Sequence, residues 1–133
     1  MGDVLAVQAA PENGAVIGVA QTILLADDEE AIRRLFALAL RQRGYTVLEA
    51  ANGMEALRAA ERFGGPIDLL LTDVTMPCLD GPGLCRGLTA GHPETKVLFM
   101  SAYPDRGTEK GAFLQKPFTP HVLLRKIHEV MGG

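Results

Sequence analysis

The fold is indicated most clearly by residues 22–29, Thr22-Ile23-Leu24-Leu25-Ala26-Asp27-Asp28-Glu29. The run from Thr22 to Ala26 is short and almost continuously apolar, as in a strand buried on both faces, and three consecutive acids end it. A helix is predicted next, ending at Gly44, because apolar residues recur at the spacing of one helix face. This stripe consists of Ile32, Leu35, Phe36, Ala39 and Leu40, and the residues off the stripe include Arg33, Arg34 and Arg41.

The alternation of strand and helix continues along the chain. Further apolar runs predict strands at Tyr45–Glu49, Ile67–Thr72, Lys96–Met100 and Ala112–Gln115. Helices are predicted from Asn52-Gly53 to about Phe63, over Pro82–Ala90, and from Thr119-Pro120 to about Met131. Five strands that alternate with helices predict an α/β domain of three layers, a doubly wound five-stranded parallel sheet covered on both faces.

The residues before this domain have a different character. Residues 1–21 carry only Asp3 and Glu12 as charges and show no sustained period of 2 or 3.6. We therefore expect a disordered tail or linker at residues 1–21 and one domain at residues 22–133. A short extra strand or helix within Ala15–Ala20 is the alternative.

Composition excludes several classes of function. The chain has 133 residues, 47% hydrophobic and 22% charged, which fits a single globular domain. Thirteen Lys and Arg against sixteen Asp and Glu give a net charge of −3, so we expect no direct nucleic-acid binding. No apolar run approaches the roughly 20 residues of a membrane span, and no positive charge precedes a hydrophobic N-terminal stretch. We expect no membrane insertion and a cytoplasmic location, and oligomeric state stays open.

Polar side chains follow the predicted strands where each strand ends. In parallel sheets the carboxyl ends of the strands form the ligand crevice, so these side chains would collect there: Asp27, Asp28, Asp73, Ser101 and Lys116. Three carboxylates at one place repel one another, and such a cluster usually persists around a cation. Oxygen ligands favour a hard metal, Mg²⁺ or in its place Mn²⁺. The alternative for Asp27 and Asp28 is a helix N-terminus with favourable dipole placement.

These residue types together suit one kind of chemistry. Lys116 supplies a mobile positive charge for a carboxylate or phosphoryl oxygen, and Ser101 supplies a hydroxyl donor. A carboxylate, a metal, a cation and a hydroxyl are the groups needed for phosphoryl transfer to an aspartate. Asp73 is the best candidate for the nucleophile because it ends the central strand, whereas Asp27 and Asp28 are better placed to hold the metal.

The chain resembles the receiver domains of the two-component response-regulator family. The resemblance covers roughly Thr22 to Met131, and each of its motifs is weak alone but stands in the expected order on a strand end. The matching stretches are residues 24–29 (LLADDE), residues 70–77 (LLTDVTMP) followed by Asp80-Gly81, residues 100–102 (MSA) and residues 113–118 (FLQKPF). The resemblance implies a flavodoxin-like sheet of strand order 2-1-3-4-5, which is known for this architecture and does not follow from these residues alone.

The resemblance also assigns roles to residues. It implies that Asp73 accepts a phosphoryl group from a phosphohistidine on a sensor histidine kinase or histidine phosphotransfer protein. The module would then be no enzyme in its own right, although it assists its own phosphorylation and dephosphorylation. Mg²⁺ would be held by Asp28, Asp73 and the backbone carbonyl of Thr75, with Asp27 acting through water.

The same resemblance implies a conformational switch. Lys116 would pair with Asp73 and then with the phosphoryl oxygens, while Ser101 and Phe113 would move on phosphorylation. The added charge and acceptors would bias an equilibrium between two loop arrangements. Phe113 has the alternative role of an ordinary core or edge aromatic. The Lys116-Pro117 bond is a candidate cis peptide.

The sequence departs from the family between the fourth and fifth predicted strands. Only the nine residues from Tyr103 to Gly111 are left for this crossover, which is too few for a strand-length helix and its turns. We therefore expect a fourth helix that is short or missing, which puts in doubt both the family's common dimer face and the usual switch.

Two questions of context and class remain open at this stage. The chain is either a stand-alone receiver or a receiver from a larger protein such as a hybrid histidine kinase. A pseudo-receiver that binds a partner constitutively is the alternative function. A hydrolase with an aspartyl nucleophile is a third option, but Thr75 lacks the second carboxylate that such an enzyme needs.

Overall fold

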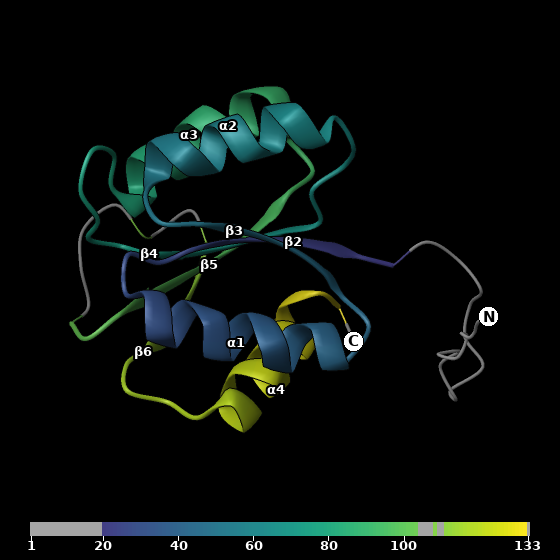
Figure 1. Ribbon diagram of the computed structural model, residues 1–133, viewed down its shortest axis with the longest axis vertical. Coiled ribbons are helices and arrows are strands. Elements are labelled where there is room, and N and C mark those ends of the chain that lie inside the picture. The colour runs from purple at the N-terminus through teal and green to yellow at the C-terminus, as the bar shows by residue number, and fades with distance from the viewer. Residues whose placement is uncertain (1–19, 104–107, 109–110, 133) are drawn as a thin grey trace.

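The computed structural model describes residues 20–103, 108 and 111–132, and it contains one parallel sheet between two layers of helices (Figure 1). The sheet has five strands in the order β3-β2-β4-β5-β6. Counted along the described chain, this is the order 2-1-3-4-5, so the predicted architecture is confirmed. The strands are β2 (Thr22–Ala26), β3 (Thr46–Ala50), β4 (Leu69–Asp73), β5 (Lys96–Ser101) and β6 (Ala112–Gln115).

Four described helices cover the two faces of the sheet. Helices α1 and α4 lie together on one face, and α2 and α3 lie together on the other (Figure 1). Their bounds are α1 (Glu30–Gln42), α2 (Gly53–Phe63), α3 (Gly81–Gly91) and α4 (Pro120–Val130). These elements agree with the predicted ones to within about two residues at each end, the usual uncertainty of an element boundary.

Local chemistry explains where three of the helices begin. The side chains of Asn52, Asp80 and Thr119 accept hydrogen bonds from the backbone N–H groups at the starts of α2, α3 and α4. Such caps satisfy donors that have no partner inside the helix. In α2 the Glu55 side chain also accepts from the N–H of Ala51, the residue before the N-cap, at 2.8 Å. The termini are therefore fixed by residues that the sequence makes visible.

The core consists of two apolar clusters, one on each face of the sheet. Alternate strand residues point to opposite faces, so Leu24 and Leu70 pack under α2 and α3, while Leu25 and Leu71 pack under α1 and α4. Every residue of β2 and β4 is buried. Burial on both faces explains why these two strands are continuous apolar runs without a period of 2.

The predicted apolar stripe of α1 is wrong at one position. Leu35 is 47% exposed, whereas Phe36, Ala37 and Leu40 are buried against the sheet. The ring of Phe36 stacks on that of Phe118 at a centroid distance of 5.2 Å, which fixes the face that α1 turns inward. The apolar stripe is wider than the surface that the sheet and α4 can cover, so its edge stays in solvent.

Two of the sequence predictions fall largely outside the described residues. The tail or linker at residues 1–21 is described only at residues 20 and 21, and it stays a prediction. Within the crossover from β5 to β6 the structure describes residues 102, 103, 108 and 111, none of which is helical. The expected loss of a fourth crossover helix otherwise concerns residues 104–107 and 109–110, which lie outside the described part of the chain.

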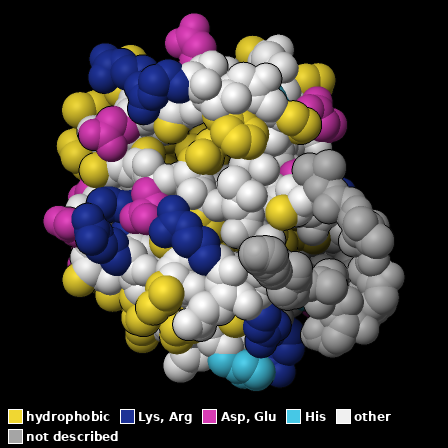
Figure 2. Space-filling view, turned by 45° about the vertical axis from the view of Figure 1, so that its right-hand side comes forward, with side chains coloured by type: hydrophobic (Ala, Val, Ile, Leu, Met, Phe, Trp, Pro, Cys, Tyr) yellow, Lys and Arg dark blue, Asp and Glu magenta, His cyan; other side chains and the backbone are white. Residues whose placement is uncertain are grey.

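One face of the described surface carries mixed charge (Figure 2). On the face in Figure 2, Lys and Arg side chains are interspersed with Asp and Glu side chains. Among the helices that the structure describes, none has both the length and the apolar composition of a membrane span.

Candidate functional site

The sheet brings the predicted polar residues to one edge. Asp27 directly follows β2, Asp73 is the last residue of β4, Ser101 is the last residue of β5, and Lys116 directly follows β6. The strands end almost level, because Ala26 pairs with Thr72 and Asp73 pairs with Met100. Four positions that lie far apart in the sequence therefore meet at the carboxyl edge of the sheet.

Three carboxylates form a compact cluster at this edge. Asp27, Asp28 and Asp73 each offer an oxygen, and these oxygens lie within 4.8 Å of one another. Asp27 and Asp73 are buried, while Asp28 is exposed. A donor set made only of oxygens, with two of its carboxylates removed from water, fits a hard divalent cation such as Mg²⁺. The predicted convergence of these carboxylates is thus present in the structure.

Lys116 inserts its ammonium group between the carboxylates. Its Nζ lies 2.6 Å from Oδ1 of Asp73, 3.5 Å from Oδ2 of Asp27 and 3.8 Å from Oε1 of Glu29. The backbone N–H of Lys116 donates to the carbonyl of Ser101 at 2.8 Å, which holds the residue beside the end of β5. The Lys116-Pro117 bond is cis, as predicted. Glu29, to which the sequence assigned no role, is thus a third acidic neighbour of this lysine.

The electrostatics of Asp73 reflect burial more than its ion pair. Burial raises the pKa of the Asp73 carboxyl to about 7, and the hydrogen bond with Asp27 adds to this rise, while Lys116 opposes it. Burial alone would lower the pKa of Lys116, but the hydrogen bond and charge of Asp73 and the charges of Asp27 and Glu29 outweigh it and raise this pKa. An ammonium placed among several carboxylates cannot neutralise them all. The carboxyl of Asp73 therefore keeps its proton to a higher pH than an exposed aspartate does.

The proposed switch residues lie next to this cluster. Ser101 is half-buried, and its Oγ accepts a hydrogen bond from the backbone N–H of Tyr103 at 3.2 Å. Phe113 is half-buried in β6, opposite Phe99, and packs against the core under α2 and α3. Thr75 is exposed, two residues after Asp73. The positions suit the roles that the resemblance implies, and those roles stay predictions.

The loop after β4 approaches the backbone of Asp73 closely. The N–H of Gly81 donates to the carbonyl of Val74 at 2.8 Å, and a Cβ at Gly81 would collide with the backbone oxygen of Asp73. A glycine is needed at this position because of the contact, not because of its φ angle. The Asp80-Gly81 pair therefore starts α3 and lets it pack against the candidate nucleophile.

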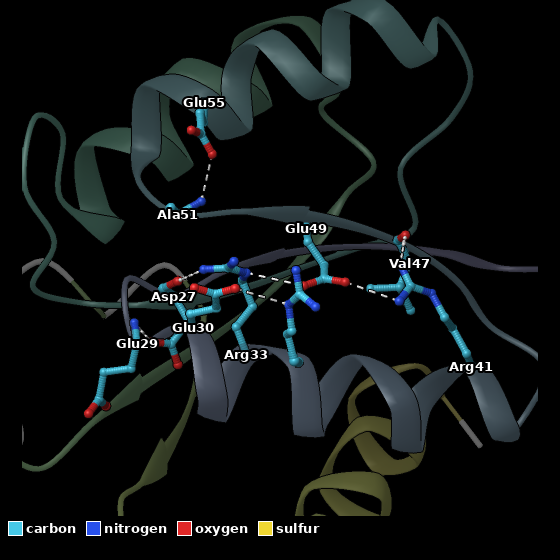
Figure 3. Close-up of polar contacts among 10 residues, drawn as sticks. Asp27, Glu29, Glu30, Arg33, Arg41, Val47, Glu49, Ala51 and Glu55 are labelled. Atoms are coloured by element: carbon cyan, nitrogen blue, oxygen red, sulfur yellow. Dashed lines mark hydrogen bonds and ion pairs between the residues drawn. The ribbon is translucent and has the colours of Figure 1, made fainter.

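Two arginines of α1 bind Glu49 on β3, and one of them also reaches the site, which the sequence did not predict. Arg33 contacts the backbone of Asp27 and the side chain of Glu49, and Arg41 contacts Glu49 as well (Figure 3). The only sequence signal is that Glu49 lies near the end of an otherwise apolar strand. Glu49 is far enough in sequence from either arginine that local sequence patterns do not predict the contact.

Comparisons with known proteins agree with this geometry. The model of the response regulator receiver domain matches residues 23–128. The chain is 34% identical over 116 residues to response regulator receiver protein CpdR of Brucella abortus (strain 2308), covering 82% of this chain and 95% of that protein.

Two further matches differ in context. Sensor kinase CckA of the same organism is 42% identical over 117 residues, which cover 83% of this chain but only 12% of the kinase. The solved structure of response regulator protein TrrA from Thermotoga maritima, in complex with Mg(2+)-BeF, has a TM-score of 0.72 and 29% identity, over 83% of this chain and 98% of that one. The same domain thus matches both a protein of nearly its own length and a small part of a kinase.

Proposed function

The chain belongs to the response regulator receiver domain family, and on that premise we propose that it is a phosphoacceptor module of a two-component phosphorelay. Asp73 receives the phosphoryl group from a phosphohistidine on a sensor histidine kinase or a histidine phosphotransfer protein. The observation that carries the proposal is the 2.6 Å contact of Lys116 with Asp73 inside a cluster of carboxylates. Cytoplasmic location and oligomeric state stay predictions.

The proposed metal site is built from oxygen ligands alone. Asp28, Asp73 and the backbone carbonyl of Thr75 would hold Mg²⁺, with Mn²⁺ as a substitute, and Asp27 would act through water. Support comes from the oxygen-only cluster and from the Mg²⁺ complex of the related TrrA. When bound, the cation neutralises charge on the carboxylates and on the phosphoryl oxygens.

The chain's own residues supply the remaining chemistry. An ionised oxygen of Asp73 attacks phosphorus, the phosphorus–nitrogen bond of the donor breaks, and the donor histidine keeps that electron pair. The ammonium of Lys116 lies where the charge of the transferred group develops, so it stabilises that charge. Burial of Asp73 removes water that would otherwise compete with the phosphoryl group.

Phosphorylation then acts on the end of β5 and on β6. The hydroxyl of Ser101 leaves its contact with Tyr103 and donates to the phosphoryl group, and Phe113 packs inward behind it. The module assists its own phosphorylation and dephosphorylation but turns over no separate substrate.

Intact mass measurement tests the proposal. The protein is incubated with a small phosphodonor and Mg²⁺, and we expect a gain of one phosphoryl group in the wild type and none in Asp73→Asn. Glu30→Gln is the matched control, because it neutralises an exposed carboxylate outside the cluster, and it should react as the wild type does.

Three outcomes would contradict the proposal. No gain in the wild type favours a pseudo-receiver that binds its partner constitutively. An equal gain in Asp73→Asn places the phosphoryl group elsewhere. Steady hydrolysis of a phosphate ester favours the hydrolase alternative.

A further inference from the structure

Two arginines of α1 share the single carboxylate of Glu49 on β3 (Figure 3). Nε of Arg33 lies 3.2 Å from Oε1 of Glu49, and Nη1 of Arg41 lies 3.0 Å from Oε2. The Arg33 side chain is only 12% exposed and that of Arg41 is 48% exposed. Arg33, the less exposed of the two, is therefore held in one orientation, since its guanidinium is confined and its acceptor is shared.

The two arginines differ in the backbone oxygen that each one binds. Nη2 of Arg41 donates to the carbonyl of Val47 within β3, at 2.9 Å. Nη1 of Arg33 donates to the carbonyl of Asp27, also at 2.9 Å. That carbonyl belongs to the peptide between Asp27 and Asp28, so Arg33 binds the link between two acids of the cluster.

The backbone of Asp27 is thus held by β3 at its N–H and by α1 at its carbonyl. Its N–H donates to the carbonyl of Ala50 at 3.1 Å, and its carbonyl accepts from Arg33, which Glu49 orients. Without Arg33 this partly buried carbonyl loses that donor, and the peptide is free to rotate. Rotation would separate two carboxylates that must converge with Asp73 on one cation.

We infer that Arg33, oriented by Glu49, is a positioning residue that preorganises Asp27 and Asp28 for divalent cation binding. The inference rests on the proposed function, since it concerns the same cation. Partners that orient metal ligands usually contribute about tenfold or more to metal affinity. Electrostatics alone predicts the opposite sign, because removing a positive charge near a cation site favours the cation. The direction of the change therefore separates positioning from charge.

Calorimetric titration of the full chain with Mg²⁺ at fixed pH and ionic strength tests the inference. We expect Arg33→Gln to raise the Mg²⁺ Kd about tenfold, and Arg33→Lys to raise it less because one donor survives. Arg41→Gln is the matched control: it removes the other arginine from Glu49 and leaves the carbonyl of Asp27 bonded. Its Kd should stay within about twofold of the wild type.

Urea unfolding of each variant separates lost structure from lost positioning. If Arg33→Gln does not unfold cooperatively, Glu49→Gln replaces it, because this variant keeps Arg33 but weakens its orienting partner, and it too should weaken Mg²⁺ binding. An unchanged or lower Kd in the folded member of this pair overturns the inference while leaving the proposed function intact. A wild type that binds no Mg²⁺ overturns the proposed metal site and the inference together.

Discussion

Replacing Asp73 by Asn should stabilise the metal-free protein at neutral pH and lose this effect in acid. In the folded state burial and the hydrogen bond with Asp27 raise the pKa of Asp73 to about 7 from its usual value of 3.8. Between these two pH values the folded protein binds more protons at this carboxyl than the unfolded protein does. The favourable contribution of Asp73 is therefore fully present below about pH 4 and is lost as the pH rises through about 7.

The size of the effect follows from the shift. A rise from 3.8 to about 7 corresponds to about 4 kcal/mol, at about 1.4 kcal/mol for each pKa unit. The side chain of Asp73 is 8% exposed, so solvent screens little of this. The asparagine of the variant carries no charge at any of these pH values and keeps an oxygen for Lys116. The difference in unfolding free energy, variant minus wild type, should thus increase by up to about 4 kcal/mol between pH 4 and pH 8.

Urea unfolding of both proteins in the presence of a chelator, at pH values from 4 to 8, measures this difference in unfolding free energy. Carboxylates that do not contact Asp73 are common to both proteins and cancel in the subtraction, whereas the interaction with Asp27 is part of the measured effect. Lys116→Met provides an internal check: it removes the cation that opposes the shift, so the loss of stability should extend to higher pH. A difference that stays constant, or that falls as the pH rises, would refute the reasoning, because it would mean that Lys116 outweighs burial.

Three further predictions concern the framework of the site. Gly81→Ala should destabilise the protein by about 1–3 kcal/mol and slow phosphorylation, because the new Cβ collides with the backbone oxygen of Asp73. An unchanged free energy of unfolding in urea together with an unchanged phosphorylation rate would contradict this. Cys78→Gly should stabilise the protein by about 0.5 kcal/mol, since Cys78 has a φ of +72°, a conformation that glycine adopts without strain. If the variant is no more stable than the wild type in reducing buffer, the backbone of Cys78 is not strained. Phe36 and Phe118 stack at 5.2 Å, so a double-mutant cycle with Leu at both positions should give a coupling energy of about 0.5–1.5 kcal/mol. If the losses of unfolding free energy in the two single variants simply add up in the double variant, the stacking contributes nothing to stability.

The sequence predicts this sheet well because its strands are unusually clear. Strands β2 and β4 are buried on both faces, so they are largely apolar, and an acidic residue at or just after the end of each one marks the edge of the sheet. Once the parallel order is assumed, Asp27, Asp73 and Lys116 must lie close together. The candidate site therefore follows from strand ends alone, without any knowledge of side-chain contacts.

The features of α1 that the sequence did not predict have a different physical origin. The exposure of Leu35 and the low exposure of the Arg33 side chain both depend on how α1 is rotated against the sheet. The spacing of apolar residues predicts the buried face of a helix only to within the width of the apolar stripe. The rotation of α1 is fixed by the contact of Phe36 with Phe118, which lies far away in sequence. Arg33 lies off the apolar stripe in the sequence pattern for the same reason, although its long side chain reaches Glu49 on β3. Contacts of this kind are set by tertiary packing and leave no local periodic pattern.

The charge balance at the site explains how phosphorylation at Asp73 would reach the rest of the sheet. The ammonium of Lys116 contacts Asp73, Asp27 and Glu29 together, so its position depends on which of them is most strongly charged. Forming an acyl phosphate removes the full charge from the carboxylate of Asp73 and adds up to two charges on the phosphoryl group. The closest partner of Lys116 is thereby replaced. The backbone N–H of Lys116 donates to the carbonyl of Ser101, so this lysine lies at the ends of both β5 and β6. Under the proposed function, the residue that neutralises the nucleophile thus loses its closest partner when the nucleophile is modified.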